Sequence, residues 1–416
     1  MKILALTWKH PQDPTAGGAE RYLVEVTGRW ADAGHDVTIF GPQLPGSEEP
    51  RGGGRGVKVG YVGEGSRLTV FGRATAYLRA QGTKFDAVLE TVSTRPFGAH
   101  RMVGRKAVVL YHQTAEDVWN QEFPLPVALI GRYLLEPWWI RRLRGAVIVA
   151  NSPSTAAALQ RFGLVSQAVV PPGCDIPDAV EIRAGPSARP RLLWIGRMVR
   201  TKRPEDAIKA YALIRGRIPD ATLDMAGAGY LQAMPAARDI PDVAIHGPVS
   251  ELAKRALLAG ADLLLLPGTR EGWGIVAMEA ASYGVPVVAY DIPGLRDAVV
   301  NGETGILVAP NPSALAGAAH RVLTDPALWC LLSQGARERA LRFSWDQCAG
   351  DLLACLPPHC GIAAQGSASV SHYSTGHTSS IQALPFDRNL IARTAPGAPA
   401  RGLAPLSPDH RSRTST

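Results

Sequence analysis

One stretch, residues 261–291, limits the folds that this chain can adopt. It begins with the unbroken apolar run LLLL at residues 263–266, which is typical of a strand buried on both faces. A turn rich in Pro and Gly follows, and apolar residues then recur at helical spacing before a second strand at residues 285–290. Strand, glycine turn, helix and strand make one βαβ unit of a parallel sheet. Ligands of such sheets bind at the carboxyl ends of the strands.

The turn of this unit predicts an anion-binding site. Gly268, Gly272 and Gly274 carry no Cβ atom, so backbone N–H groups at the start of the helix can approach a ligand closely. Glu271 lies at the mouth of that helix, and Glu279 lies about two turns into it. A carboxylate can accept two hydrogen bonds from a vicinal diol, so each acid is a candidate sugar-binding group. The alternative for each is a solvated surface side chain.

The two glutamates are eight residues apart and enclose the sequence GWGIVAM. This stretch resembles the signature of the family-four retaining glycosyltransferases (glycosyl transferases group 1). That family has the GT-B fold, in which two Rossmann-like domains face each other across a cleft. The resemblance implies that Glu271 faces the hydroxyls of a donor sugar and that Glu279 binds the ribose hydroxyls. It also implies donor-binding positions at Gly272, Trp273, Gly274, Ile275 and Val276.

Composition sets the broad class of the protein. A chain of 416 residues with 46% hydrophobic content can form two domains, each with its own core. The net charge of +8 favours anionic ligands or an anionic membrane surface. Nucleic acid is not an expected partner, because Arg and Lys are scattered through both halves and no recognition-helix or RNA-binding signature is present.

The cysteines and the first residues predict a cytoplasmic protein. The five cysteines all follow residue 173 and form no Cys-X-X-Cys pair, which favours a reducing compartment. The initial run MKILALTW reaches His10 and Pro11 too soon for a signal peptide or a membrane span.

The first half of the chain alternates strand and helix patterns, which predicts a parallel sheet. Gly17 and Gly18 precede a helical pattern that contains Tyr22 and Trp30, so they form a glycine loop at a helix N-terminus. The family resemblance extends to this GGAE sequence. It implies that Gly17 and Gly18 face the donor diphosphate and the acceptor. The strands are expected at residues 2–8, 37–40, 57–61, 85–90, 107–111, 147–151 and 168–170.

His112 follows the strand at residues 107–111 and is a candidate catalytic residue. A histidine at the carboxyl end of such a strand lies over the ligand crevice, where it can donate to a sugar hydroxyl or a phosphate. The resemblance implies a functional histidine at this strand end. The alternative is a histidine bonded to a neighbouring loop.

Residues 124–144 combine Leu, Ile, Trp138 and Trp139 with four arginines. Basic residues beside Trp and Leu suit an anionic membrane interface, and a lipid-linked acceptor would require such contact. Apolar residues at helical spacing also occur in core helices whose arginines form a solvated edge. Both interpretations stay open on the sequence alone.

A second sheet is expected from residue 192, after a linker rich in Pro and Gly. Its first strand ends at Gly196 and Arg197, and Lys202 lies in the loop before the next helix. The family motif has an Arg and a Lys at this spacing. The resemblance implies that Arg197 and Lys202 bind the donor diphosphate and, with His112 and Glu271, form the catalytic set. Gly196 and His246 complete the predicted donor-binding residues.

These patterns predict five segments. Residues 1–172 form an acceptor-side Rossmann-like domain, 173–190 a linker, and 191–343 a sugar-nucleotide-binding domain. Residues 344–356 form a helix that crosses back to the first domain. From residue 357 to residue 416 the composition shifts to Ser, Thr, Ala, Gly and Pro, which predicts a disordered tail.

The expected activity is retaining sugar transfer from a nucleotide-diphosphate sugar to an acceptor hydroxyl, with the donor as a substrate and no cofactor. The chain has no Asp-X-Asp pair and no His or Cys cluster at metal-ligand spacing, so no metal is expected. Two alternatives remain. A sugar-nucleotide epimerase or a phosphorylase shares the architecture, and a catalytically idle subunit could bind the donor without transferring it.

Overall fold

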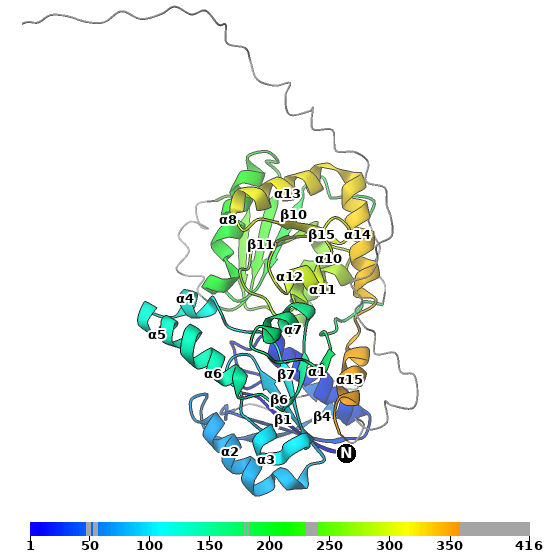
Figure 1. Ribbon diagram of the computed structural model, residues 1–416. Coiled ribbons are helices and arrows are strands. Elements are labelled where there is room, and N and C mark those ends of the chain that lie inside the picture. The colour runs from blue at the N-terminus through cyan, green and yellow to red at the C-terminus, as the bar shows by residue number, and fades with distance from the viewer. Residues whose placement is uncertain (47–50, 53–56, 179, 181–182, 230–239, 358–416) are drawn as a thin grey trace, which may run out of the picture. The chain divides into compact units, whose positions relative to one another are not determined.

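The chain folds into two parallel β-sheets covered by helices. The computed structural model describes residues 1–46, 51–52, 57–178, 180, 183–229 and 240–357 (Figure 1). The first sheet has seven strands in the order β5-β2-β1-β6-β7-β8-β9, and the second has six in the order β12-β11-β10-β13-β14-β15. We call the parts built on these sheets the N-terminal half and the C-terminal half. The predicted α/β fold with two Rossmann-like units is confirmed.

The N-terminal half alternates strands and helices. Its sheet strands are β1 (Lys2–Leu6), β2 (Asp36–Gly41), β5 (Gly60–Gly63), β6 (Ala87–Val92), β7 (Ala107–Tyr111), β8 (Val147–Ala150) and β9 (Ala168–Val169). Its helices are α1 (Gly18–Asp32), α2 (Val70–Gln81), α3 (His100–Val103), α4 (Val118–Glu122), α5 (Leu125–Ile130), α6 (Glu136–Arg141) and α7 (Pro153–Gln160). The strand β1 lies between β2 and β6, and its register aligns Leu4 with Thr38 of β2 and with Val88 of β6.

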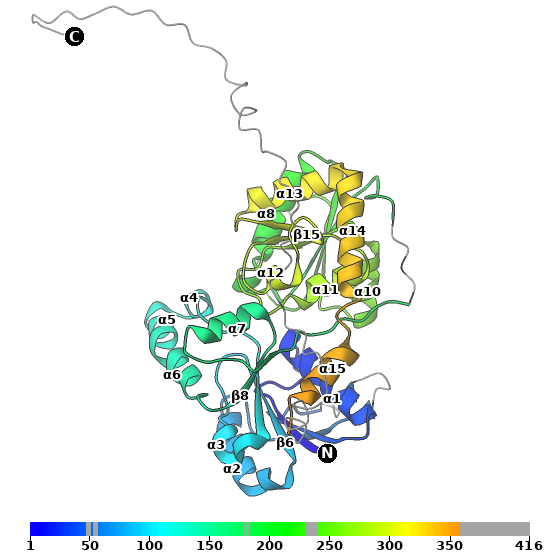
Figure 2. The ribbon, with the colours of Figure 1, turned by 45° about the vertical axis from the view of Figure 1, so that its right-hand side comes forward.

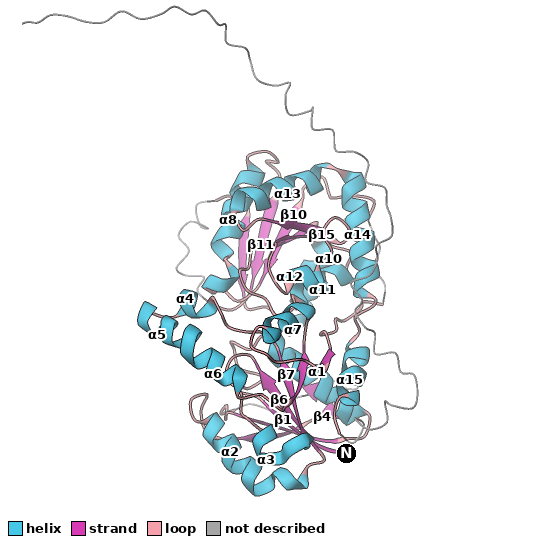
Figure 3. Cartoon of the chain, in the orientation of Figure 1, coloured by secondary structure: helices cyan, strands magenta, loops and turns pink. Residues whose placement is uncertain are grey.

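The C-terminal half repeats the pattern. Its strands are β10 (Arg191–Ile195), β11 (Thr222–Ala226), β12 (Val243–Gly247), β13 (Leu263–Leu266), β14 (Val287–Tyr290) and β15 (Gly305–Val308). Its helices are α8 (Pro204–Arg215), α10 (Glu251–Gly260), α11 (Ile275–Ser282), α12 (Leu295–Ala298), α13 (Pro312–Thr324) and α14 (Pro326–Ala340). Figure 3 shows α8 and α13 on one side of these strands and α10, α11 and α14 on the other.

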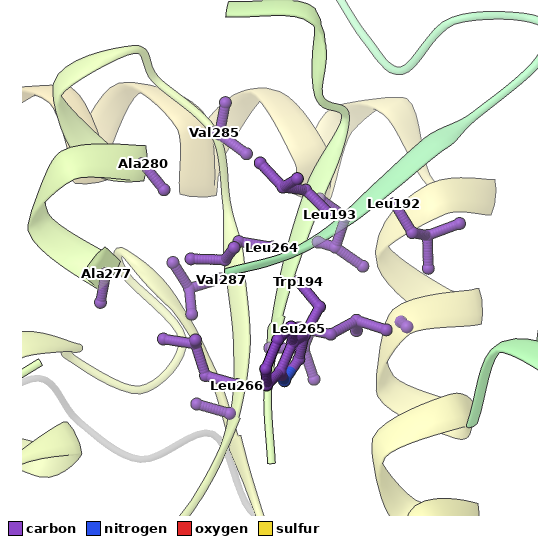
Figure 4. Packing of buried hydrophobic residues seen from close by; sticks show 14 of the residues in the cluster. Leu192, Leu193, Trp194, Leu264, Leu265, Leu266, Ala277, Ala280, Val285 and Val287 are labelled. Carbon is purple, nitrogen blue, oxygen red and sulfur yellow. The ribbon is translucent and has the colours of Figure 1, made fainter. Parts of the chain in front are cut away.

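The core of the C-terminal half explains why the run at residues 263–266 forms a strand. All four leucines of β13 are buried, and Leu264 and Leu265 are fully buried between β10 and β14 (Figure 4). Trp194 and Val287 pack in the same cluster. A strand buried on both faces contacts apolar neighbours on each side, so its residues do not alternate between apolar and polar. The continuous apolar run is therefore the pattern expected of a central parallel strand.

The last described helix, α15 (Trp345–Ala354), packs on α1 of the N-terminal half, and Figures 1 and 2 show the two helices side by side. Trp345 and Leu352 are buried in the cluster that also contains Tyr22 and Trp30. The indole nitrogen of Trp30 donates to the carbonyl of Ala349 at 2.9 Å. A segment that follows the C-terminal half in sequence is therefore part of the N-terminal core.

Several sequence-based boundaries were wrong. The strand expected at residues 57–61 is divided, because β4 (Val57–Lys58) pairs antiparallel with β3 (Arg51–Gly52), whereas β5 pairs parallel with β2. The strand expected from residue 285 begins at Val287, and β15 was not predicted at all. The predicted tail lies outside the described residues, apart from Pro357. The domain boundaries themselves stay a prediction. Among the described residues, no helix is long and apolar enough to span a membrane.

Candidate active site

The loop between β13 and α11 forms one wall of the candidate site. Gly274 precedes α11 with φ +100°, a left-handed conformation that favours glycine, and a Cβ atom there would lie 3.0 Å from Cδ2 of Leu295. Glycine at this position thus permits both the turn and the close packing of α12. The helix then begins at Ile275, with its N-terminal backbone amides facing the loop.

The glycine loop before α1 forms the opposite wall. The carboxylate of Glu20 accepts a hydrogen bond from the backbone N–H of Gly17 at 2.7 Å, which closes the first turn of α1. A Cβ atom on Gly18 would lie 3.0 Å from Cδ1 of Ile275. The starts of α1 and α11 therefore lie close together, one from each half.

Between these walls is a cleft of about 470 Å³. Most of the residues that the sequence analysis predicted for the site line this cleft, and they come from both halves of the chain. The predicted residues that line it are Gly17, Gly18, His112, Arg197, Lys202, Glu271, Gly272, Trp273, Gly274, Ile275 and Val276.

Arg197, Lys202 and Glu271 lie in the connections that follow β10 and β13. The ammonium group of Lys202 forms an ion pair with the carboxylate of Glu271, and both side chains are mostly buried. Arg197 is exposed, and its Nε lies 3.8 Å from the position of a Cβ atom on Gly17. Arg197 of the C-terminal half therefore extends toward the glycine loop of the N-terminal half.

Gly272 lies at a close approach of the two halves. A Cβ atom at this position would lie 2.6 Å from the carbonyl oxygen of His112 and 3.0 Å from Nδ2 of Asn151. Both distances are shorter than ordinary van der Waals contact. A side chain on Gly272 would thus push the loop away from the carboxyl ends of β7 and β8.

His112 is buried in the cleft floor, and burial lowers its pKa to about 4. The imidazole is therefore neutral at pH 7. Its Nε2 atom is buried without a hydrogen-bond partner, and the ring packs edge-on to Tyr22 at 5.6 Å between centroids. A buried nitrogen that has no protein partner is available to a ligand hydroxyl or phosphate oxygen.

Three predicted donor-binding residues do not line the cleft. Glu279 is buried one turn into α11 and not the expected two, because the helix begins at Ile275. Its carboxylate pairs with Arg21 of α1 and with Lys254 of α10, the latter at 2.8 Å. His246 lies on the edge strand β12, and its Nε2 is 2.6 Å from a carboxylate oxygen of Asp224. Gly196 lies at the end of β10, beside the stem of Lys202. The donor-binding roles of these residues stay predictions.

The sequence analysis missed other residues of the cleft, including Lys9, Asn151 and Arg270. Lys9 follows β1 and Asn151 follows β8, so the strand-end rule that selected His112 would also have selected them. Arg270 donates to the backbone carbonyl and the hydroxyl of Thr114 in the N-terminal half. No sequence pattern indicates that contact, because it joins loops 156 residues apart.

Solved structures share this architecture. Sucrose-phosphate synthase from Thermosynechococcus elongatus superposes with a TM-score of 0.65 at 21% identity, covering 84% of this chain and 97% of that one. HepE of Anabaena, solved in complex with UDP-glucose, superposes with a TM-score of 0.61 at 19% identity, covering 86% of this chain and all of that one. Two Rossmann-like halves with a cleft between their glycine loops are thus the GT-B fold.

Sequence comparisons identify the family. The model of "Glycosyl transferases group 1" matches residues 176–339, and that of "Glycosyltransferase Family 4" matches residues 16–177. D-inositol 3-phosphate glycosyltransferase of Salinispora tropica is 30% identical over 82% of this chain and 81% of its own length. Glycogen synthase of Mycobacterium tuberculosis is 29% identical over 84% of this chain and 92% of its own length. The chain belongs to the group 1 glycosyltransferases.

Proposed function

We propose that this protein transfers a sugar from a nucleotide-diphosphate sugar to an acceptor hydroxyl and retains the anomeric configuration. The observation that carries the proposal is the meeting of Lys202, Glu271 and the glycine loop of α11 in one cleft, with Gly17 and Gly18 opposite. The solved HepE structure with UDP-glucose supports a donor of this chemical class.

The mechanism follows from the charge that develops on the leaving group. Breaking the anomeric bond leaves negative charge on a diphosphate, which fixed positive groups stabilise most in a site with little water. Arg197, Lys202 and the first backbone amides of α11 supply such groups. We infer that no metal is required, because these cations can replace one at the diphosphate.

The ion pair between Lys202 and Glu271 suggests how the cleft accepts its donor. In this proposal the diphosphate takes over the ammonium group of Lys202, which releases the carboxylate of Glu271 for the hydroxyls of the sugar. The acceptor hydroxyl attacks from the same face as the leaving phosphate, which takes its proton. The neutral imidazole of His112 orients a hydroxyl or a phosphate oxygen through its unpartnered nitrogen.

We further propose a cytoplasmic location, peripheral to the inner face of a membrane, with a lipid-linked acceptor. The reducing environment favoured by the cysteine pattern supports the compartment. The exposed apolar segment between α4 and α6 supports contact with a membrane.

The test is to incubate the full chain with a panel of sugar nucleotides and extracted membrane lipids as acceptors, and to measure nucleoside diphosphate release with and without EDTA. Release with one donor, unaffected by EDTA, supports the metal-independent transferase. Conversion of the donor to an epimer without release would indicate an epimerase, and release that requires inorganic phosphate would indicate a phosphorylase. Binding without any turnover would indicate an idle donor-binding subunit.

A further inference from the structure

Exposed apolar side chains are concentrated in one short segment of the N-terminal half. Of the fifteen exposed large apolar residues among the described part of the chain, nine lie between residues 123 and 138. The remaining six lie singly on other elements. Six of the nine, with 48–68% of their surface exposed, are Leu125, Val127, Ile130, Tyr133, Leu134 and Trp138. Such a concentration marks an interaction site, whereas single exposed leucines do not.

The geometry of this segment holds the apolar side chains outward. The helices α5 and α6 are joined by a π-helical turn, η3 (Gly131–Leu135). Ala128, Gly131 and Ile140 form the buried side, and Gly131 packs so closely on the ring of Trp119 that a Cβ atom there would overlap it. With the small residues facing inward, the bulky ones face solvent. The interpretation as a core helix is therefore wrong for most apolar side chains of residues 123–138, whereas Ile140 and Leu143 are buried as it predicts.

The exposed charges within residues 123–144 are positive. The single acid among residues 123–144, Glu136, is buried and accepts hydrogen bonds from the backbone N–H of Glu116 at 2.9 Å and from the indole N–H of Trp119 at 3.0 Å. Arg141, Arg142 and Arg144 are exposed. The guanidinium of Arg142 lies over the ring of Trp138, 4.5 Å from its centroid. Apolar side chains beside cations, with the acid turned inward, complement an anionic lipid surface.

The surface continues into the cleft. Glu122 and Phe123, at the end of α4, line the cleft, and Phe123 is also half exposed as the first apolar residue of the segment. Gln121 of the same helix accepts a hydrogen bond from the hydroxyl of Thr269 in the C-terminal half at 3.0 Å. The edge of the cleft at α4 is thus the beginning of the apolar surface.

We propose that residues 123–144 form a docking surface for an anionic membrane, and that the acceptor enters the cleft from that membrane past Phe123. The acceptor would be a lipid whose head group carries the attacking hydroxyl. Its hydrocarbon part would stay in the membrane while the hydroxyl reaches the cleft. The identity of the acceptor rests on the proposed transferase function, whereas membrane docking does not.

Flotation of the purified full chain with lipid vesicles tests the docking surface. The chain should float with vesicles that contain phosphatidylglycerol, less with neutral phosphatidylcholine vesicles, and less at high salt. The double variant Leu134→Ser/Trp138→Ser should lose most flotation. Arg141→Gln/Arg142→Gln should lower partition into anionic vesicles by roughly 25-fold, at about fivefold for each arginine.

The matched control is Leu252→Ser/Leu331→Ser, which removes two exposed leucines from α10 and α14 and should leave flotation unchanged. Equal flotation of the wild type and the Leu134/Trp138 variant would overturn the proposal. So would a concentration-dependent dimer that this variant abolishes without any vesicle binding, because the surface would then join two copies of the chain.

Nucleoside diphosphate release, measured separately with membrane lipids solubilised in detergent as acceptors, distinguishes the two proposals. Flotation without release on any donor would refute the transferase function and leave the docking surface intact. Release without flotation would refute the docking surface and leave the transferase function intact. When both occur, release should increase on adding extracted membrane lipids for the wild type and the Leu252/Leu331 control, but not for the Leu134/Trp138 variant.

Discussion

At the scale of single residues, Arg197 and Lys202 give the sharpest test of the leaving-group mechanism. Their charges act on a diphosphate that becomes more negative as the sugar leaves, so their loss should affect turnover more than donor affinity. Each alanine variant should lower the transfer rate by about a hundred- to thousandfold, measured at saturating donor. The double variant should raise the activation free energy of transfer by less than the sum of the two single variants, because both residues act on the same diphosphate.

The control is Lys209→Ala, an exposed cation on α8 that does not line the cleft. It should transfer at the wild-type rate. Near-normal rates for Arg197→Ala and Lys202→Ala would show instead that neither cation stabilises the leaving group.

Replacing Gly272 by alanine adds one methyl group and so tests the contact between the two halves. Gly272→Ala directs a Cβ atom at the carbonyl oxygen of His112, and overpacking of this kind costs about 1–3 kcal/mol. We expect turnover to fall at least about fivefold while nucleoside diphosphate affinity, measured by calorimetry, changes little. Gly268→Ala in the same loop is the matched control, because its Cβ would make an ordinary 3.5 Å contact with the carbonyl of Thr201. Equal effects of the two variants would contradict this account.

Burial of His112 predicts a defined dependence of stability on pH. Its pKa falls from about 6.5 to about 4 in the folded state, so between these values the unfolded chain binds a proton that the folded chain does not. The free energy of unfolding should therefore decrease as pH falls from 6.5 to 4, by on the order of 3 kcal/mol, and His112 should add no further loss below pH 4. Denaturant unfolding of the wild type and of His112→Gln across this range checks the prediction. Parallel pH profiles would refute it.

At the scale of secondary-structure elements, α15 should stabilise the N-terminal half although it follows the C-terminal half in sequence. Trp345 and Leu352 are buried against α1, so Leu352→Ala should lower the free energy of unfolding by about 2–5 kcal/mol. The control Leu341→Ala removes a leucine that is 56% exposed and should cost less than about 0.5 kcal/mol. Thermal unfolding of both variants gives the comparison, and similar melting temperatures would contradict the packing role.

The elements predicted best from sequence are those whose local pattern and tertiary burial agree. The run at residues 263–266 is apolar throughout and forms β13 with the expected bounds. Ser152 precedes α7, and its hydroxyl caps the helix by accepting a hydrogen bond from the backbone N–H of Thr155 at 3.0 Å. The strand β15 was missed because Gly305 begins it and most of its side chains are only half buried, which weakens the apolar signal.

The segment around α5 and α6 shows what sequence alone could not decide. Its apolar residues recur at a spacing that serves a core helix and a membrane surface equally well. The close approach of Gly131 to Trp119 and the burial of Glu136 set which side faces inward, and both depend on α4, which is not part of the pattern. The geometry of the cleft could not be predicted from the sequence for the same reason, because the contact of Gly272 with His112 joins strand ends of different sheets.

At the scale of the whole molecule, Arg21 joins the two halves. It lies on α1 and forms ion pairs with Glu279 of α11 and, at 3.0 Å, with Asp175. Its side chain is 20% exposed and that of Glu279 is 7% exposed, so solvent screens this pair less than a surface pair. The proposed chemistry needs Gly17 and Gly18 from one half and Lys202 and Glu271 from the other. We therefore expect the pair to affect catalysis by holding these groups in register.

Arg21→Met should separate nucleotide binding from catalysis, because it weakens the link between the halves and leaves the predicted donor-binding side intact. Glu279 keeps its ion pair with Lys254 of its own half, so nucleoside diphosphate affinity should stay within about threefold of the wild type, or about 0.7 kcal/mol. Turnover should fall at least about tenfold, because a small misplacement of reacting groups is costly.

The control Arg255→Met also loses a pair with Asp175, but Arg255 is 55% exposed and its loss should cost little in either measurement. Calorimetric titration with nucleoside diphosphate and steady-state kinetics measure the two quantities. If Arg21→Met weakens nucleoside diphosphate binding by much more than threefold while turnover at saturating donor is retained, then Arg21 belongs to the nucleotide site and not to the link between the halves.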